Sequence, residues 1–239
     1  MTSVMQAFDR GAARYDLLVS LNPGYHDHLD SAATEIIQRI RPRPARLRLL
    51  DIACGSGAST RALLRAAEDG ATIVGIDLSE GMLAQARAKH WPHGVRFEQG
   101  ESGRLDVEAL QSDAWHGVFA SYLFRNVPAD QRDDALSEAY DLLVPGGWLV
   151  TQEYSVAGNP KAIAIWDAVA WAVIVPLGIV IDRNPGLYRY LWRSVREFDS
   201  TTRFMDRLAD TGFTDVACRT VPGWQRGILH TFIARKPAS

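Results

Sequence analysis

The sequence predicts an α/β fold: a seven-stranded sheet with helices on both faces and an antiparallel hairpin at the C-terminal end. Apolar runs alternate with helical patterns between residues 49 and 152, which is typical of a parallel sheet covered on both faces. The last two apolar runs, 213–217 and 227–234, flank Pro222-Gly223, and these turn residues favour an antiparallel pair. The chain of 239 residues is 47% hydrophobic and 23% charged, which suffices for one sizeable core.

The expected elements follow one another in a regular order. Strands before the hairpin are expected at 49–52, 71–76, 94–97, 114–120 and 148–152. Helices are expected at 58–67, from the N-cap Ser79 towards His90, and from 128–130 to about Leu143, where Pro145-Gly146-Gly147 ends the last one. In open sheets of this kind, ligands bind at the carboxyl ends of the strands.

The most informative segment is 49–57, a short buried strand that runs into a turn containing Gly55 and Gly57. Such a turn lets a ligand approach the backbone and the following helix N-terminus closely. Asp51 stands at the strand end and Asp77 at the end of the next strand. An acid before the loop repels a pyrophosphate but holds an ammonium group, and an acid at the second strand end commonly accepts both hydroxyl protons of a ribose. A nucleoside with a cationic tail and no phosphate is S-adenosylmethionine.

Two other interpretations of the glycine loop are weaker. A dinucleotide site would need G-x-G-x-x-G, and Thr60 stands at the sixth position. A core loop whose acids only cap helices would require two acid-ended strands and a glycine turn to coincide. The sequence therefore favours S-adenosylmethionine as the cofactor.

Composition argues against several classes of protein. The 26 Lys and Arg residues stand against 28 Asp and Glu, a formal net charge of −2, which offers no basic surface for nucleic acid. Cys54 and Cys218 form no CxxC or Cys/His cluster, so neither a metal site nor a disulfide framework is expected. The first residues carry no secretory pattern, so the expected compartment is the cytoplasm. The sequence leaves a homodimer open.

We expect one methyltransferase-sized domain, 1–239, built from four segments. Residues 1–45 are a helical lid, 46–157 the cofactor-binding core, 158–198 an apolar helical insertion, and 199–239 the C-terminal helix and hairpin. The lid and the insertion lie outside the alternating pattern. Both are expected to lie over the carboxyl ends of the strands.

The apolar run 162–181 is long enough to raise the hypothesis of a membrane span. Asp167 lies inside it, and Pro176 and Gly178 are expected to break its second half. We expect one apolar helix plus a turn that form a lid or a lipophilic substrate pocket, with a plain core helix as the alternative. Two tryptophans in the run suit an interface, so membrane contact is expected to be peripheral at most.

Several motifs indicate a family. The cofactor loop 50–57, the ribose segment 75–83 and the turn 142–149 are general to class I S-adenosylmethionine-dependent methyltransferases, whose Rossmann-like sheet the chain is expected to share. More specific are 121–127, similar to S-x-G-x-R-N-V, 152–155, similar to L-E-F-S, and 190–195 with Gly212-Phe213. On these motifs the chain most resembles the ubiquinone/menaquinone-biosynthesis C-methyltransferase family.

The resemblance and the loop chemistry together imply a cofactor site. Asp51 is expected to bind the methionine amino group directly or through water, Asp77 the ribose, and Glu101-Ser102 the adenine side. The full expected set is Asp51, Ala53, Gly55, Gly57, Asp77, Leu78, Met82, Glu101, Ser102 and Ser121.

Methyl transfer from a sulfonium loses charge, so alignment of acceptor and methyl can supply most of the catalysis. Methylation of an aromatic carbon also needs electron density from a hydroxylate. Arg125 suits stabilisation of that oxyanion but cannot be the base, because a guanidinium keeps its proton. His26 or His28 is a candidate base, with Asp16 and Glu153 as further options. The alternatives are a surface position for each histidine and a structural ion pair for Arg125.

The acceptor is expected to lie beside Arg125. Its contacts are predicted from Tyr15, Tyr25, Asn126, Tyr188 and Trp192. The function predicted is methyl transfer to a small lipophilic acceptor that is aromatic, quinol-like or polyprenylated, with C-methylation favoured. The alternatives are an O- or N-methyltransferase of specialised metabolism and a non-methylating, cofactor-binding cyclase of the same fold.

Overall fold

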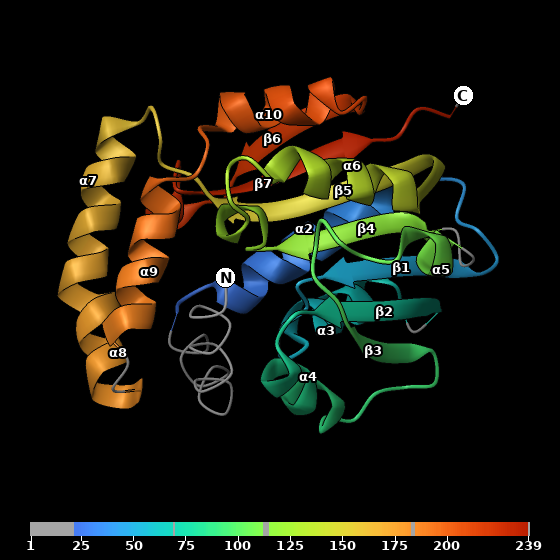
Figure 1. The fold of residues 1–239 in the computed structure, drawn as a ribbon, viewed down its shortest axis with the longest axis horizontal. Coiled ribbons are helices and arrows are strands. Elements are labelled where there is room, and N and C mark those ends of the chain that lie inside the picture. Colours follow the sequence, from blue (N-terminus) through green and yellow to red (C-terminus); the bar gives the residue numbers. More distant parts are fainter. Residues whose placement is uncertain (1–21, 69, 112–114, 183–184, 239) are drawn as a thin grey trace.

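The computed structural model describes residues 22–238 except 69, 112–114 and 183–184. A seven-stranded sheet runs through its centre in the order β3-β2-β1-β4-β5-β7-β6 (Figure 1). The strands are β1 Leu47–Ile52, β2 Ala71–Asp77, β3 Val95–Gln99, β4 Trp115–Ser121, β5 Leu143–Tyr154, β6 Thr214–Thr220 and β7 Leu229–Arg235. Strands β1 to β5 are parallel, and β7 pairs antiparallel with both β5 and β6. The predicted fold class is confirmed.

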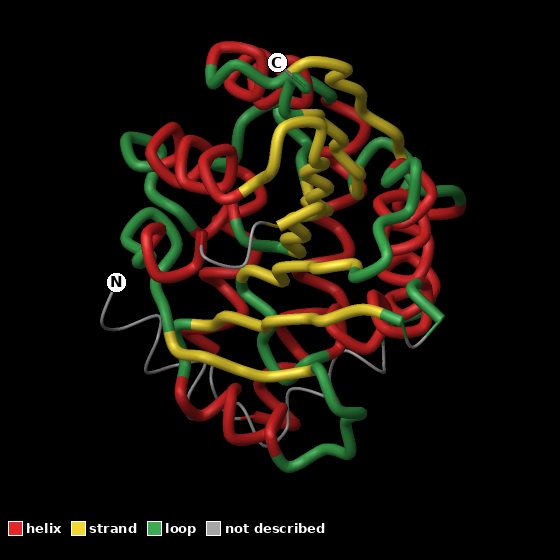
Figure 2. The backbone as a smooth tube through the Cα atoms, turned by 90° about the vertical axis from the view of Figure 1, so that its right-hand side faces the viewer, coloured by secondary structure: helices red, strands yellow, loops and turns green. Residues whose placement is uncertain are grey.

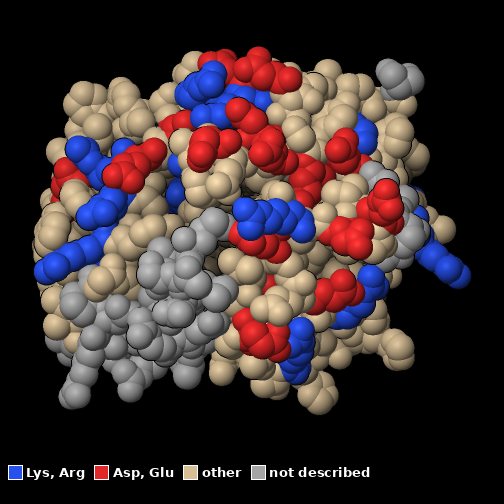
Figure 3. All heavy atoms as spheres, in the orientation of Figure 1, with Lys and Arg blue, Asp and Glu red and all other residues tan. Residues whose placement is uncertain are grey.

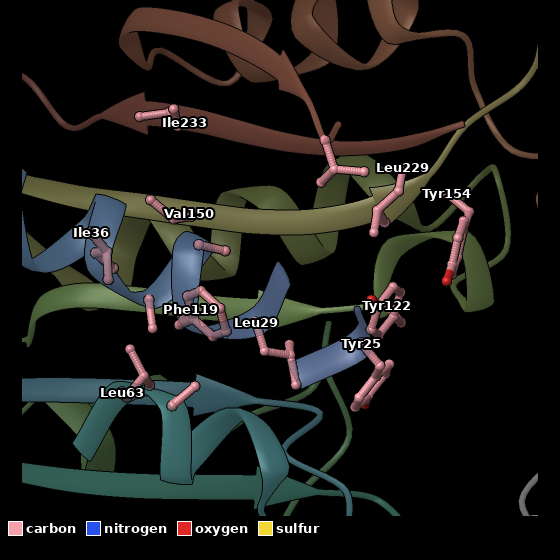
Figure 4. Close-up of a cluster of buried hydrophobic side chains, with 14 of the residues drawn as sticks. Tyr25, Leu29, Ile36, Leu63, Phe119, Tyr122, Val150, Tyr154, Leu229 and Ile233 are labelled. Atoms are coloured by element: carbon pink, nitrogen blue, oxygen red, sulfur yellow. The ribbon is translucent and has the colours of Figure 1, made fainter. Parts of the chain in front are cut away.

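Helices cover both faces of the sheet (Figure 2). They are α2 Tyr25–Arg39, α3 Ala58–Ala66, α4 Glu80–Arg87, α5 Val107–Gln111, α6 Arg132–Leu142, α7 Pro160–Val169, α8 Val175–Asp182, α9 Pro185–Arg196 and α10 Thr201–Asp210. One core layer packs α2 and α3 against the sheet (Figure 4). The other packs α6 and α10 against the opposite face. Because side chains alternate along a strand, Leu49 belongs to the first layer and Leu50 to the second.

Helix α2 is part of the core, although the sequence pattern set residues 1–45 apart from it. Leu29, Ala33 and Ile36 recur at helical spacing and are buried. The helix crosses β4 at Gly117, where a Cβ would lie 2.8 Å from the Ile36 side chain. Residues 1–21, with Tyr15 among them, lie outside the described residues, so a lid formed by that segment stays a prediction.

Strand β5 begins five residues before the expected position of Trp148. The turn residues Pro145-Gly146-Gly147 do not separate helix from strand but lie within the strand, where the register with β4 shifts. A bulge tolerates both a proline without an N–H and a glycine with positive φ, here 81° at Gly146. Helix α6 starts at Arg132, later than the expected start at 128–130.

Residues 158–198 form two helical arms that lie together on the left of Figure 1. The first is continuous through α7, a π-helical turn η2 at Ala170–Ile174, and α8. The expectation that Pro176 and Gly178 break it is wrong. The π turn directly precedes α8, whose second residue is Pro176, and such turns are a known way for a helix to accommodate a proline ring. Helix α9 then returns towards the sheet.

Candidate active site

A cavity of about 730 Å³ opens at the carboxyl ends of β1, β2 and β4. Strands β1 and β4 are neighbours from which the chain continues to opposite sides of the sheet, the usual position of a ligand in open α/β folds. Helix α2, the α7–α8 arm and α9 complete the wall. The predicted residues that line it are Tyr25, Ala53, Gly55, Asp77, Leu78, Met82, Glu101, Ser102, Ser121, Arg125, Asn126 and Tyr188.

The glycine loop and the second strand end are joined through Asp77. Its Oδ2 accepts a hydrogen bond from the Gly55 N–H at 2.8 Å, and its Oδ1 accepts one from the Ser79 N–H at 2.9 Å. A carboxylate oxygen has more than one lone pair, so it can also accept a hydroxyl proton from the cavity side. Ala53 lies beside this loop with φ 61°, a conformation that is strained for a residue with a Cβ and is typical of functional sites.

Asp51 lies buried behind the loop rather than in the cavity wall, and so does the loop residue Gly57. The Asp51 Oδ2 accepts hydrogen bonds from the hydroxyls of Ser59 at 2.7 Å and Thr60 at 2.6 Å. Burial raises the pKa of Asp51 to about 7, against the effect of these two hydrogen bonds. Its Oδ1 has no hydrogen-bond partner among the described residues. A cation bound at the loop would offset the negative charge of this oxygen, so Asp51 is compatible with the ammonium group of the predicted cofactor.

The far end of the cofactor side is formed by the loop 100–105. Glu101 and Ser102 line it, and the buried Ser102 Oγ has no partner in the described part of the chain. Glu138 of α6 holds the loop, because its carboxylate accepts hydrogen bonds from the Gly103 and Leu105 N–H groups at 2.7 and 2.5 Å. Glu138 is distant from the loop in sequence and belongs to no motif, so no local pattern predicts its role.

Arg125 stands at the other end of the cavity on a 3-10 turn, η1 Phe124–Asn126, directly after β4. Its Nη1 donates to Ser194 Oγ at 2.7 Å and to Asn126 Oδ1 at 3.2 Å. Tyr190 donates its hydroxyl proton to the same Asn126 oxygen at 3.1 Å. The Arg125 Nε has no hydrogen-bond partner among the described residues. The guanidinium is therefore oriented from one side and retains donor capacity.

Ser194 and Tyr190 were not identified as site residues. Both belong to the segment 190–195, whose family signature was recognised without a role being assigned to its side chains. The structure brings both residues to the Arg125 end of the cavity, although Ser194 is 69 positions from Arg125 in the sequence. The signature was the signal that could have found them.

Glu153 is buried behind the turn and does not line the cavity. Its Oε1 accepts from the Phe124 N–H at 2.6 Å, while its Oε2 lies 3.9 Å from Arg125 Nε. Burial raises the pKa of Glu153 to about 7, and Arg125 acts in the opposite direction. The geometry gives this carboxylate a positioning contact with η1 rather than contact with a substrate.

Three aromatic rings stack along the wall between the two ends of the cavity. Tyr25 and Tyr122 have ring centroids 5.8 Å apart, and Tyr122 and Tyr154 5.2 Å apart (Figure 4). Trp166 follows at 5.2 Å from Tyr154 in a tilted arrangement. Tyr122 has φ 61°, so the backbone is strained where it turns this ring into the stack. Flat rings and apolar neighbours suit a flat acceptor ring.

Two predicted residues lie away from the cavity. His26 is exposed on α2 and contacts the edge of the Tyr25 ring, because successive helix positions point about 100° apart and Tyr25 takes the inward one. Trp192 faces the α7–α8 arm, where its Nε1 donates to Asp167 at 2.8 Å. Neither residue lines the cavity. Tyr15 lies outside the described residues.

A parallel sheet with an antiparallel C-terminal hairpin, a glycine loop after β1 and an acid after β2 define a class I S-adenosylmethionine-dependent methyltransferase. On the cofactor side, oxygens of Asp51, Ser102 and Ser121 have no hydrogen-bond partner within the described part of the chain. The ubiE/COQ5 methyltransferase family model matches residues 1–236, and the chain belongs to this family.

Named relatives agree with this assignment. The chain is 33% identical over 228 residues to the ubiquinone/menaquinone biosynthesis C-methyltransferase UbiE of Methylobacterium nodulans, covering 92% of this chain and 86% of that protein. It is 30% identical to the demethylmenaquinone methyltransferase of Streptomyces avermitilis, covering 92% and 90%. The structure of phosphoethanolamine N-methyltransferase 2 from Haemonchus contortus with S-adenosyl-L-methionine aligns with a TM-score of 0.62 at 18% identity, covering 96% of this chain and 57% of that one. The last match shows a shared fold.

Proposed function

We propose that this enzyme methylates a ring carbon of a lipophilic, quinol-type aromatic acceptor. One observation carries the proposal: the buried Arg125 guanidinium, fixed by Ser194 and Asn126, faces a cavity whose wall is a stack of aromatic rings. A hydroxyl of a flat ring would meet the guanidinium while the ring lies against the stack. The relatives named as quinone C-methyltransferases support the same acceptor class.

In this proposal the cofactor side works through contacts already formed by the chain. The Asp77 carboxylate, held by the Gly55 and Ser79 N–H groups, accepts the ribose hydroxyl protons. The negative charge of Asp51 behind the loop attracts the methionine ammonium directly or through water, and Glu101 and Ser102 contact the adenine side. S-adenosylmethionine supplies an electrophilic methyl group when it is bound.

The acceptor side supplies orientation and charge. A cation close to a phenolic hydroxyl favours its ionised form, so Arg125 lowers the pKa of the acceptor hydroxyl and stabilises the oxyanion that donates electron density to the ring. The activation is thus electrostatic and needs no base in the wall. The hydroxyl proton, and the proton lost from the ring carbon once the new C–CH₃ bond has formed, would both leave to water. His26 and Glu153 do not line the cavity, and Glu153 keeps η1 in place.

The test is methyl transfer from methyl-labelled S-adenosylmethionine to a short-chain demethylated quinol, with the product position determined by NMR. A new ring C–CH₃ supports the proposal. An O- or N-methyl product from other acceptors would support the alternative of specialised metabolism. Tight cofactor binding without methyl loss to any lipophilic phenol would favour a non-methylating cyclase of the same fold.

We also propose that the enzyme works in the cytoplasm with peripheral contact to a membrane, because a quinol with an apolar tail resides in lipid. By length and composition, one helix among the described residues, Pro160–Ile179, could cross a membrane. Membrane fractionation tests this proposal: protein released by carbonate washing is peripheral, and protein that stays in the pellet has a span.

A further inference from the structure

Residues 168–181, here called the apolar arm, contain no charged side chain and no polar one. The arm comprises the end of α7, the π turn and almost all of α8. Trp171 is 48% exposed and Ile179 46% exposed. A helix on the surface of a globular protein normally turns charged residues outward, so this arm has the composition of a buried helix without the burial.

Within the described residues, the arm contacts the rest of the molecule along a narrow line. Ala170 and Val175 are buried, and Gly178 lies so close to the Tyr188 ring that a Cβ there would be 2.1 Å from it. The residues between these contact positions in the π turn and α8 are mostly exposed. The apolar exposure therefore covers the outer part of the helix and is more than a single stray side chain.

We propose that the apolar arm inserts into one leaflet of an anionic lipid bilayer and does not cross it. The arm has 14 residues, or about 21 Å of helix, which is less than the ~30 Å hydrocarbon core of a bilayer and more than the ~15 Å of one leaflet. The arm is therefore too short to cross and enters one leaflet at a tilt. Asp167 marks the upper limit of insertion, because it accepts from Trp192 Nε1 and lies 3.6 Å from Arg196 on α9. The arm is thus anchored to the protein at one end and too short to span.

Charge on the neighbouring helix fits the headgroup layer. Arg189 and Arg193 are exposed on α9, which packs against α8. Basic side chains, with some acidic ones among them, are also visible along the left of the molecule, where α7 and α9 run (Figure 3). Basic side chains beside an inserted apolar segment are attracted to anionic lipid headgroups. This combination favours a lipid surface over an uncharged apolar partner.

The arm also reaches the active site. Val173, Ile174 and Leu177 line the cavity near Tyr188, so an apolar surface continues from the outside of the arm to the acceptor end. With the arm in the leaflet, a lipophilic acceptor can move from lipid to Arg125 along apolar side chains. The insertion deepens the proposed peripheral membrane contact, and this last step also rests on the proposed methyl transfer.

Flotation of the purified full-length protein with phosphatidylcholine vesicles, with and without phosphatidylglycerol, tests the insertion in the absence of both substrates. We expect flotation with the anionic vesicles. Ala172→Glu combined with Ile179→Glu places two charges on exposed positions that do not line the cavity and should weaken binding about tenfold or more. The matched control is Gln38→Glu combined with Ala84→Glu, which adds the same charge on exposed positions of α2 and α4 and should bind like the unmodified protein.

Quenching by lipids brominated in their acyl chains reports depth. The unmodified protein should be quenched, and Trp171→Phe, which keeps the arm apolar, should float equally well but lose part of the quenching. Absence of flotation by the unmodified protein overturns the proposal, as does resistance to carbonate extraction, which indicates a span. The unmodified protein could instead form a dimer and not bind vesicles, while the Ala172→Glu, Ile179→Glu protein stays monomeric. That result would identify a second copy of this chain as the partner of the apolar arm and overturn the proposal. Cofactor affinity measured on the same samples reports separately on the proposed methyltransferase site.

Discussion

The cofactor end and the acceptor end of the cavity are built in different ways. The cofactor end is formed by strand ends and the loops that follow them, and its main contacts join residues at most 35 positions apart, as Glu138 to Gly103 does. The acceptor end joins η1 to α9 and the segment before α2 to β5. The separations are 69 positions for Arg125 and Ser194 and 132 for Asn22 and Tyr154. Cofactor binding is therefore a property of the core, and acceptor recognition depends on packing of the outer helices.

Substitution of Arg125 tests the comparison most severely. If its guanidinium stabilises developing oxyanion charge, Arg125→Ala should lower turnover by about two to three orders of magnitude. Cofactor affinity should stay nearly unchanged, because no hydrogen bond in the described chain links Arg125 to the glycine loop. Arg125→Lys should recover little activity, since a lysine has a single nitrogen and cannot meet Ser194 and Asn126 through one donor group, as Nη1 does, while presenting others to the acceptor.

Steady-state kinetics and calorimetry on the same preparations provide the measurement. An equal loss of turnover and of S-adenosylmethionine affinity in Arg125→Ala would assign the residue to structure. The two ends of the cavity would then be one unit, and the comparison would fail.

The converse substitution is Asp77→Ala. It removes an acceptor of charge-assisted hydrogen bonds, so cofactor binding should weaken by about 1.5–3 kcal/mol. The Gly55 and Ser79 N–H groups lose their partner too, so the loop should become less ordered. Asp77→Asn keeps an acceptor oxygen without the charge, so its cofactor affinity should lie between those of the unmodified protein and Asp77→Ala.

Isothermal titration with S-adenosylmethionine measures this effect. Unchanged affinity in a folded Asp77→Ala protein would contradict the ribose assignment. Acceptor KM measured at saturating cofactor should not move in either variant.

The buried carboxylate behind η1 makes stability depend on pH. Glu153 has a pKa of about 7 in the folded protein against 4.5 as its ordinary value, so between these values the folded state holds more protons than the unfolded state. The free energy of unfolding should fall as pH rises from about 4.5 to 7, by on the order of 1–3 kcal/mol from this residue. Glu153→Gln keeps an acceptor for the Phe124 N–H and should flatten the slope.

Urea unfolding at several pH values without cofactor measures the slope. Asp51 has a similarly raised pKa and contributes in the same direction, so Glu153→Gln should reduce the slope without abolishing it. An unchanged slope would mean that the carboxylate is ionised in the folded protein, paired with Arg125.

The contrast between the two ends also explains what the sequence could predict. The strands of the parallel sheet, the glycine loop and the N-cap Ser79 follow from local patterns, and the structure brings Asp77 to the loop. The position of His26 and Trp192 did not follow, because a helical position one residue from the buried face points away from it. The continuous α7–α8 arm was missed since proline and glycine weaken a helix locally, whereas the π turn and packing on Tyr188 accommodate both.

The smallest expected effect comes from Ser194, which contacts Arg125 and not the cofactor loop. Ser194→Ala removes one neutral-to-charged hydrogen bond of 2.7 Å, worth about 1 kcal/mol in orientation of the guanidinium, so turnover should fall about fivefold. Because the Asn126 contact remains, Arg125 keeps part of its orientation, and the loss should be far smaller than in Arg125→Ala. Ser194→Thr retains the hydroxyl and should restore activity. A double Arg125→Ala, Ser194→Ala protein should be no slower than Arg125→Ala alone, because a serine that acts only through the arginine has no further effect once the arginine is gone. Additive losses would show that Ser194 meets the acceptor itself, and the acceptor end would then extend onto α9.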